Sequence, residues 1–149
     1  MLKSLNIDTV SESSARQMSA SHLAYVGDAV FDVFVRSRII QRFGDWGINQ
    51  INTIKVGVVK ASQQARIAKM LMEHLSESEM AILKRGRNTK TQSVPKNALL
   101  ADYRYATGFE ALVGYLVVSG QQDRLNQLLS LSWELCEADG LLVIKKGLR

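Results

Sequence analysis

The stretch from His22 to Asp32 constrains the fold of this chain more than any other part of the sequence. It lies in a run from Leu23 to Ile40 that is apolar at most positions, which is typical of a buried helix. Asp28 stands in that run, with Gly27 beside it. Burying a carboxylate is costly unless it is paired or metal-bound, and glycine within a helix often marks the close approach of another backbone. These two adjacent exceptions predict a functional site.

Helical spacing predicts how this segment is bounded and oriented. We expect a helix that begins at a cap provided by Ser19 or Ser21 and that ends near Phe43, with Gly44 as its stop. Residues at helical spacing are expected to form its buried face, namely Leu23, Val26, Val30, Val33 and Phe34.

Composition limits the class of protein. The 149 residues, with 46% hydrophobic and 22% charged residues, predict one soluble globular domain with its own core. The formal net charge of +5 favours a polyanionic partner such as nucleic acid. The single cysteine, Cys136, excludes an internal disulfide. No signal peptide is visible, and the charges between Leu23 and Ile40 exclude a membrane span, so we expect a cytoplasmic protein.

A second helix is predicted from Gln50 to Glu73 by apolar residues at helical spacing. The opposite side of this segment is basic, and no acidic residue occurs between Asp45 and Glu73. Such one-sided charge indicates either a solvated face or a contact with nucleic acid. The basic residues are Lys55, Lys60, Arg66 and Lys69.

A basic loop follows a short helix whose start is marked by Ser76 and Glu79, which have the spacing of a capping box. The loop runs from Lys84 to Asn97 and holds five basic residues, which equals the net charge of the whole chain. Its polar side chains can hydrogen-bond a phosphate backbone, so phosphate contact is favoured over a solvated loop. The predicted binding residues are Lys84, Arg85, Arg87, Asn88, Lys90, Lys96 and Asn97.

A third apolar segment, Tyr103 to Ser119, repeats the first pattern. Glu110 lies among apolar residues, with Gly108 and Gly114 nearby. We therefore expect the two helices to pack so that Asp28 and Glu110 come together. Mg²⁺ would let both carboxylates stay ionised, because it prefers hard oxygen ligands. A buried salt bridge for each carboxylate is the alternative, and the pattern alone does not decide between them. With no segment of strand periodicity, the predicted fold class is all-α.

These motifs resemble those of the ribonuclease III family. The hexapeptide Tyr25-Val26-Gly27-Asp28-Ala29-Val30 is similar to the core of the family's signature helix, and Phe109-Glu110-Ala111-Leu112-Val113-Gly114 matches its second motif. The basic loop with Tyr103-Arg104-Tyr105 resembles the Mini-III subgroup in particular. Both motifs occur in the right order, and the resemblance covers most of the chain.

The resemblance implies a single all-α catalytic domain over residues 1–149, without a separate double-stranded-RNA-binding domain. It implies a two-fold homodimer that cleaves double-stranded RNA with Mg²⁺, for which Mn²⁺ could substitute, in the maturation of large-subunit ribosomal RNA. Asp28 and Glu110 match family metal ligands. Ser21 and Thr107 stand where the family has carboxylates, so a full two-metal site is in doubt, although both hydroxyl groups could orient metal-bound water.

Two other functions compete with this interpretation. One is a non-catalytic RNA-binding or ribosome-assembly protein that retains the fold, which the two missing carboxylates favour. The other is a metal-dependent phosphohydrolase acting on a small molecule, which would not need a long basic loop. Retention of both Asp28 and Glu110 favours the endoribonuclease.

Overall fold

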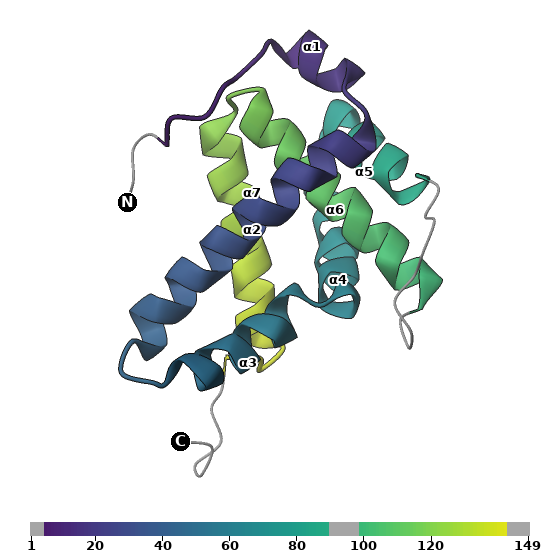
Figure 1. Ribbon diagram of the computed structural model, residues 1–149. Helices are drawn as coiled ribbons and strands as arrows, with labels where there is room; N and C mark the ends of the chain where they lie inside the picture. Colours follow the sequence, from purple (N-terminus) through teal and green to yellow (C-terminus); the bar gives the residue numbers. More distant parts are fainter. Residues whose placement is uncertain (1–4, 90–98, 143–149) are drawn as a thin grey trace.

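The computed structural model of the chain describes residues 5–89 and 99–142. Within these residues every regular element is helical, which confirms the all-α prediction (Figure 1). The elements are α1 (Glu12–Gln17), α2 (Ala20–Phe43), α3 (Ile48–Val59), α4 (Ala61–Leu71), a 3₁₀ turn (Met72–His74), α5 (Glu77–Arg87), α6 (Leu100–Val118) and α7 (Gln122–Ala138).

Helix α2 begins and ends close to where the sequence predicts. The Ser19 hydroxyl accepts a hydrogen bond from the main-chain N–H of His22 at 3.1 Å, so Ser19 rather than Ser21 is the cap. The predicted inward face is right for Leu23, which is buried, and for Val26, Val30 and Phe34, which pack partly buried against the core. It is wrong for Val33, which is 63% exposed. A fully buried row repeats every four residues, at Leu23, Gly27, Phe31, Val35 and Ile39.

The prediction of one helix from Gln50 to Glu73 is also wrong. Lys60 has extended backbone angles, with φ −61° and ψ 153°, and separates α3 from α4. It ends α3 by donating its N–H to the carbonyl of Val56, and its own carbonyl accepts from the N–H groups of Gln63 and Gln64. The break redirects the chain, so that α3 packs against α2 while α4 packs against α6 (Figure 1).

Helix α6 is the central element, and α2, α4 and α5 all pack against it. Nearly every residue of its second half is buried, so its sequence lacks the polar face of a surface helix. The aromatic rings of Phe31 on α2 and Phe109 on α6 meet edge to face, with their centroids 4.8 Å apart. In Figure 1, α2 crosses in front of α6 near the middle of the molecule.

The capping box predicted at the start of α5 is confirmed, since the main-chain N–H of Ser76 donates to the Glu79 carboxylate and the main-chain N–H of Glu79 donates to the Ser76 hydroxyl. Glu79 is buried and forms a salt bridge with Arg124 of α7 at 2.8 Å. This partner lowers the pKa of Glu79. Arg124 also donates to the carbonyl of His74, so one guanidinium ties α7 to the start of α5. None of the described helices is both long and apolar enough to cross a membrane.

Candidate metal and catalytic site

The candidate site is built where two glycines let α2 and α6 touch through their backbones. A β carbon on Gly27 would lie 1.8 Å from the carbonyl oxygen of Glu110, and one on Gly114 would lie 1.8 Å from the carbonyl oxygen of Leu23. Any larger residue would force the helices apart. The predicted close approach at Gly27 is therefore confirmed, and it places the main chain of Glu110 directly against the turn that carries Asp28.

The carboxyl groups of Asp28 and Glu110 interact across this crossing, as the sequence predicts. Burial, followed by the negative charge of Asp28, raises the pKa of Glu110 to about 8, and a hydrogen bond with Asp28 acts in the same direction. Without a cation, Glu110 is therefore mostly protonated at neutral pH. Two carboxylates this close need a positive charge between them before both can ionise.

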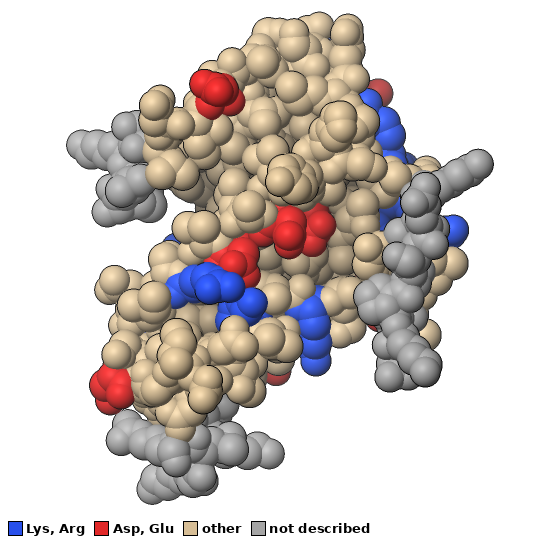
Figure 2. All heavy atoms as spheres, viewed as in Figure 1, with Lys and Arg blue, Asp and Glu red and all other residues tan. Residues whose placement is uncertain are grey.

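Asp28 itself differs from the prediction in one respect, because it is exposed rather than buried. Only Glu110 lies partly within the core. The pair thus has one solvent-facing and one sheltered carboxylate, an arrangement that an ion or substrate can reach from outside. Figure 2 shows acidic side chains near the middle of the visible face, with basic side chains immediately beside them.

An ion-pair cluster lies one helical turn beyond Asp28. Asp32 accepts from Arg36, one turn further along α2, at 2.5 Å, and its other oxygen lies 3.6 Å from the amino group of Lys55. Sequence reasoning missed the contribution of Lys55, because it comes from α3 and the contact depends on how α3 packs against α2. Asp32 is therefore engaged by two cations.

Gln64 of α4 is a site residue that sequence reasoning missed. Its side-chain amide hydrogen-bonds Glu110 and lowers the pKa of that carboxyl group, so the amide N–H is the donor. Gln64 is only 2% exposed, and its Oε1 has no hydrogen-bond partner among the described residues. The sequence signal that could have identified it is a glutamine next to Ala65, on the apolar side of the second predicted helix.

The chemistry of these groups fits a divalent cation. Two carboxylates and an amide oxygen are hard oxygen donors of the kind that Mg²⁺ and Mn²⁺ prefer. The raised pKa of Glu110 indicates an excess of negative charge that a cation would neutralise. Within residues 5–89 and 99–142, no three His, Cys, Asp or Glu side chains come close enough to form a metal site, so water would supply several ligands.

Comparison with known proteins identifies the family. Residues 21–121 match the family described as "Ribonuclease III domain". The chain belongs to the ribonuclease III family. It is therefore an endoribonuclease that acts on double-stranded RNA. Enzymes of this family generally depend on a divalent metal ion, in agreement with the donor set at Asp28 and Glu110.

Curated relatives and one solved structure support this assignment. Proteins named Mini-ribonuclease 3 are 39% identical over 82% of this chain and 81% of the relative in Clostridium tetani, and 43% identical over 77% and 88% in Symbiobacterium thermophilum. The crystal structure of a protein from Fusobacterium nucleatum superposes with a TM-score of 0.72 and 28% identity, covering 80% of this chain and 94% of the other.

Ser21 and Thr107, at which the resemblance leads us to expect carboxylates, differ in their surroundings. Ser21 is exposed near the start of α2. Thr107 is partly buried, and its hydroxyl donates to the carbonyl of Tyr103 at 3.0 Å, which leaves its oxygen able to accept. Roles for Ser21 and Thr107 in orienting metal-bound water stay predictions.

The predicted RNA-binding residues divide into four groups. Lys84 and Asn88 are exposed at the end of α5. Arg85 has an internal contact that the sequence did not predict, because its guanidinium donates to the carbonyls of Arg16 and Met18 at 2.6 and 2.7 Å. It thus anchors the end of α1 to α5. Arg87 donates to the Asn88 side chain at 3.3 Å. The remaining three lie outside the described residues, namely Lys90, Lys96 and Asn97.

Two basic surfaces that look separate in the sequence meet at one aromatic ring. Arg87 of α5 and Lys69 of α4 both lie over Tyr105 of α6, at 5.6 and 4.8 Å from its centroid. Arg87, predicted to lie in the basic loop, is instead the last residue of α5, and with the basic side of the second predicted helix it forms one patch. Arg66 does not extend this patch freely, since it pairs with Asp139.

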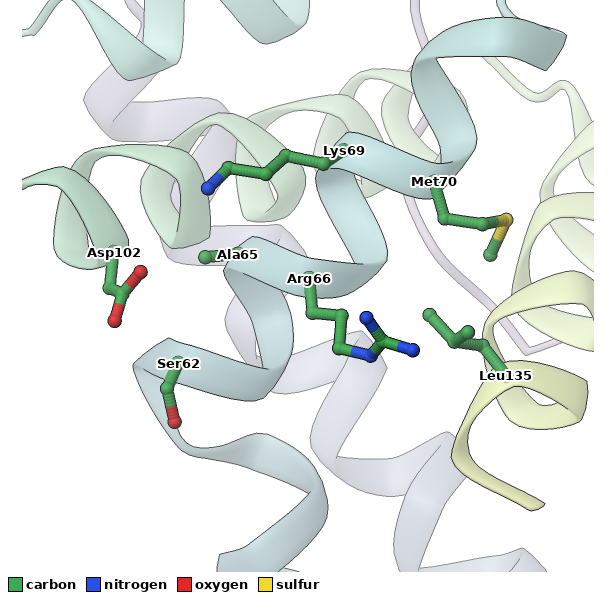
Figure 3. Close-up of a pocket in the computed structure, with 7 residues that line it drawn as sticks. All are labelled: Ser62, Ala65, Arg66, Lys69, Met70, Asp102 and Leu135. Atoms are coloured by element: carbon green, nitrogen blue, oxygen red, sulfur yellow. The ribbon is translucent and has the colours of Figure 1, made fainter. Parts of the chain in front are cut away.

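A hollow of about 520 Å³ lies beside α4, and neither Asp28 nor Glu110 lines it (Figure 3). Lys69 extends toward Asp102 on one side of this hollow, and Arg66 extends toward Leu135 on the other. Because neither carboxyl group of the pair lines it, we do not place the catalytic centre in this hollow.

Proposed function

We propose that this enzyme cleaves both strands of duplex RNA in a Mg²⁺-dependent reaction, with Asp28 and Glu110 as metal ligands and catalytic residues. The observation that carries the proposal is the pairing of these two carboxyl groups across the glycine-mediated crossing of α2 and α6. Mn²⁺ is expected to replace Mg²⁺, because carboxylate oxygens suit both ions.

The two carboxylates have different tasks in this proposal. Asp28 would hold the cation from the exposed side and Glu110 from the sheltered side. When bound, the cation would supply an activated water and stabilise the leaving oxygen of the phosphodiester. The backbone contact at Gly27 holds the two helix turns that carry these ligands against each other before RNA binds.

The proposed natural substrate is a precursor of large-subunit ribosomal RNA. This part of the proposal is supported by the resemblance of the basic loop to the Mini-III subgroup and by the relatives named Mini-ribonuclease 3. We place the enzyme in the cytoplasm, where a buried free thiol such as Cys136 would stay reduced.

We further propose that the enzyme acts as a two-fold homodimer, with one site for each RNA strand. The proposed interface is the exposed apolar stripe of α2, where Tyr25 is 83%, Val33 is 63% and Ile40 is 55% exposed. Large exposed apolar patches are typical of protein contacts. Tyr25 and Asp28 are three residues apart on this helix, so such a dimer would bring the two sites near one interface.

A cleavage assay tests the proposed function. Purified protein is incubated with a ribosomal-precursor duplex, an unrelated duplex and a single strand, each with Mg²⁺, Mn²⁺ or EDTA. We expect both duplexes to be cleaved with either ion and the ribosomal duplex to be cleaved at defined positions. Cleavage in EDTA, or equal cleavage of the single strand, would overturn the proposal.

A further inference from the structure

We propose that Gln64 is a positioning residue of the divalent-cation site: its amide N–H orients the Glu110 carboxylate, and its Oε1 accepts a hydrogen bond from water held by the cation. The inference rests on the proposed function of Asp28 and Glu110. It extends the site to a third helix, α4, and to a residue type that motif searches for carboxylates would overlook.

The burial of Gln64 carries the first step. Its side chain is 2% exposed, yet Oε1 has no partner among the described residues. Buried polar atoms are almost always hydrogen-bonded, because an unpaired one loses its bonds to water without replacement. An unpaired acceptor next to a carboxylate pair therefore indicates a donor that the protein itself does not supply. Water bound to a cation at Glu110 would be such a donor.

The neighbouring residue, Gln63, differs from Gln64, so an unpaired side-chain oxygen is not common to every buried glutamine of α4. Gln63 is also buried, but its Nε2 donates to Asp139 at 3.1 Å and to the Cys136 sulfur at 3.6 Å. Those contacts hold α4 against the end of α7. Gln63 thus has a structural role away from the carboxylates, whereas Gln64 contacts Glu110.

The small number of carboxylates at the site increases the importance of an orienting hydrogen bond from Gln64. No third acidic side chain among the described residues joins Asp28 and Glu110. With only two charged ligands, the orientation of each matters more to cation affinity. Groups that orient a metal ligand through a hydrogen bond typically change metal affinity or activity by about 10- to 100-fold when removed.

The test measures Mn²⁺ binding to the whole protein by calorimetry and by the electron paramagnetic resonance signal of free Mn²⁺. Gln64→Met keeps the length of the side chain but removes both hydrogen-bonding groups. We expect Mn²⁺ affinity to fall at least about tenfold while the protein stays folded. Unchanged Mn²⁺ affinity would overturn the inference.

Gln63→Met is the matched control. We expect it to lower the melting temperature, because the contacts with Asp139 and Cys136 are lost, and to leave Mn²⁺ affinity within about twofold. If Gln64→Met does not fold, Gln64→Leu replaces it, since this variant also removes both hydrogen-bonding groups. It should bind Mn²⁺ at least about tenfold more weakly than wild type, and wild-type affinity would contradict the proposal.

Duplex cleavage by the same proteins separates this inference from the proposed function. We expect excess Mn²⁺ to restore kcat in Gln64→Met and the KM for RNA to stay unchanged. If wild type neither binds Mn²⁺ nor cleaves RNA, the proposed function fails. If wild type does both and Gln64→Met behaves identically, only the role of Gln64 fails.

Discussion

Gly27 lies against the main chain of Glu110 so closely that a β carbon would stand 1.8 Å from the Glu110 carbonyl oxygen. This contact between α2 and α6 holds the two carboxyl groups together. We predict that Gly27→Ala destabilises the fold by about 3 kcal/mol or more, because backbone atoms cannot yield as a flexible side chain can. Thermal unfolding measures the effect.

Gly57 provides the control for this substitution. It also lies inside a helix, α3, but a β carbon there would meet nothing within 4 Å. Gly57→Ala should therefore stabilise the protein by about 0.5–1 kcal/mol through helix propensity. Equal effects of the two variants would show that the crossing tolerates a side chain.

Neutral replacements of the two carboxylates should separate chemistry from folding. We expect Asp28→Asn and Glu110→Gln each to reduce duplex cleavage at least about 100-fold, because each removes a charged metal ligand. RNA affinity, measured in Ca²⁺ or EDTA, should change little. A variant that cleaves normally would remove that residue from the proposed site, and one that unfolds would give it a structural role instead.

Stability without divalent ions should fall as pH rises, because of Glu110. Its pKa is about 8 in the folded protein against an ordinary value of 4.5, so the folded state holds a proton that the unfolded chain has released between these values. This proton uptake makes the wild type lose stability from about pH 4.5 to 8, with no further loss above that range. Glu110→Gln cannot ionise and should lack this loss.

The measurement is the melting temperature of both proteins between pH 4.5 and 9 in EDTA. We expect the melting temperatures of the two proteins to diverge as pH rises. The difference in their free energies of unfolding should reach the order of a few kcal/mol, since a tenfold change in proton affinity corresponds to about 1.4 kcal/mol. Mn²⁺ should reduce this difference, because it stabilises only the wild type. Parallel curves in EDTA would show that Glu110 has an ordinary pKa.

The exposed stripe of α2 should determine the oligomeric state. We expect Tyr25→Ser combined with Val33→Ser to convert the dimer to a monomer, because two large apolar contacts are lost from each protomer. Duplex RNA should then be nicked in one strand rather than cut in both. Light scattering and native gels read the two outcomes. Ile48→Ser, at an apolar position of α3 that is 76% exposed, is the control and should stay dimeric.

RNA affinity should depend on the end of α5. We expect Lys84→Gln combined with Arg87→Gln to weaken binding to all duplexes similarly and to flatten the log–log salt dependence by about 2, since each lost phosphate contact contributes about 0.9. Cleavage should recover at saturating RNA. Arg85 is omitted because it holds the carbonyls of Arg16 and Met18, so its loss should lower stability.

A double variant of Arg38 and Arg42 to glutamine removes the same net charge near the end of α2 and serves as the control. It should keep the wild-type salt slope. If both double variants changed the slope equally, general charge rather than the basic loop would be responsible for RNA binding.

Sequence by itself determined the helical class, a serine cap at Ser19 or Ser21, the cap at Ser76, and the pairing of Asp28 with Glu110. Each of these depends on local chemistry or on a repeated exception, namely a carboxylate and a glycine within an apolar helix. Glycine at position 27 predicted the contact between α2 and α6, because only a residue without a side chain permits two backbones to touch. The predicted binding residues between 90 and 98 lie outside the described part of the chain.

Only the tertiary structure decided how deeply each side of α2 is buried. Val33 and Phe31 are equally apolar, but α6 packs against Phe31 and leaves Val33 in solvent. Three further features appear only in the tertiary structure. The second predicted helix is broken at Lys60, Arg85 makes an internal contact, and Gln64 lies against Glu110. These outcomes depend on the directions in which neighbouring helices cross. Helical periodicity in a single segment does not encode those directions, because several faces of an apolar helix could serve equally well.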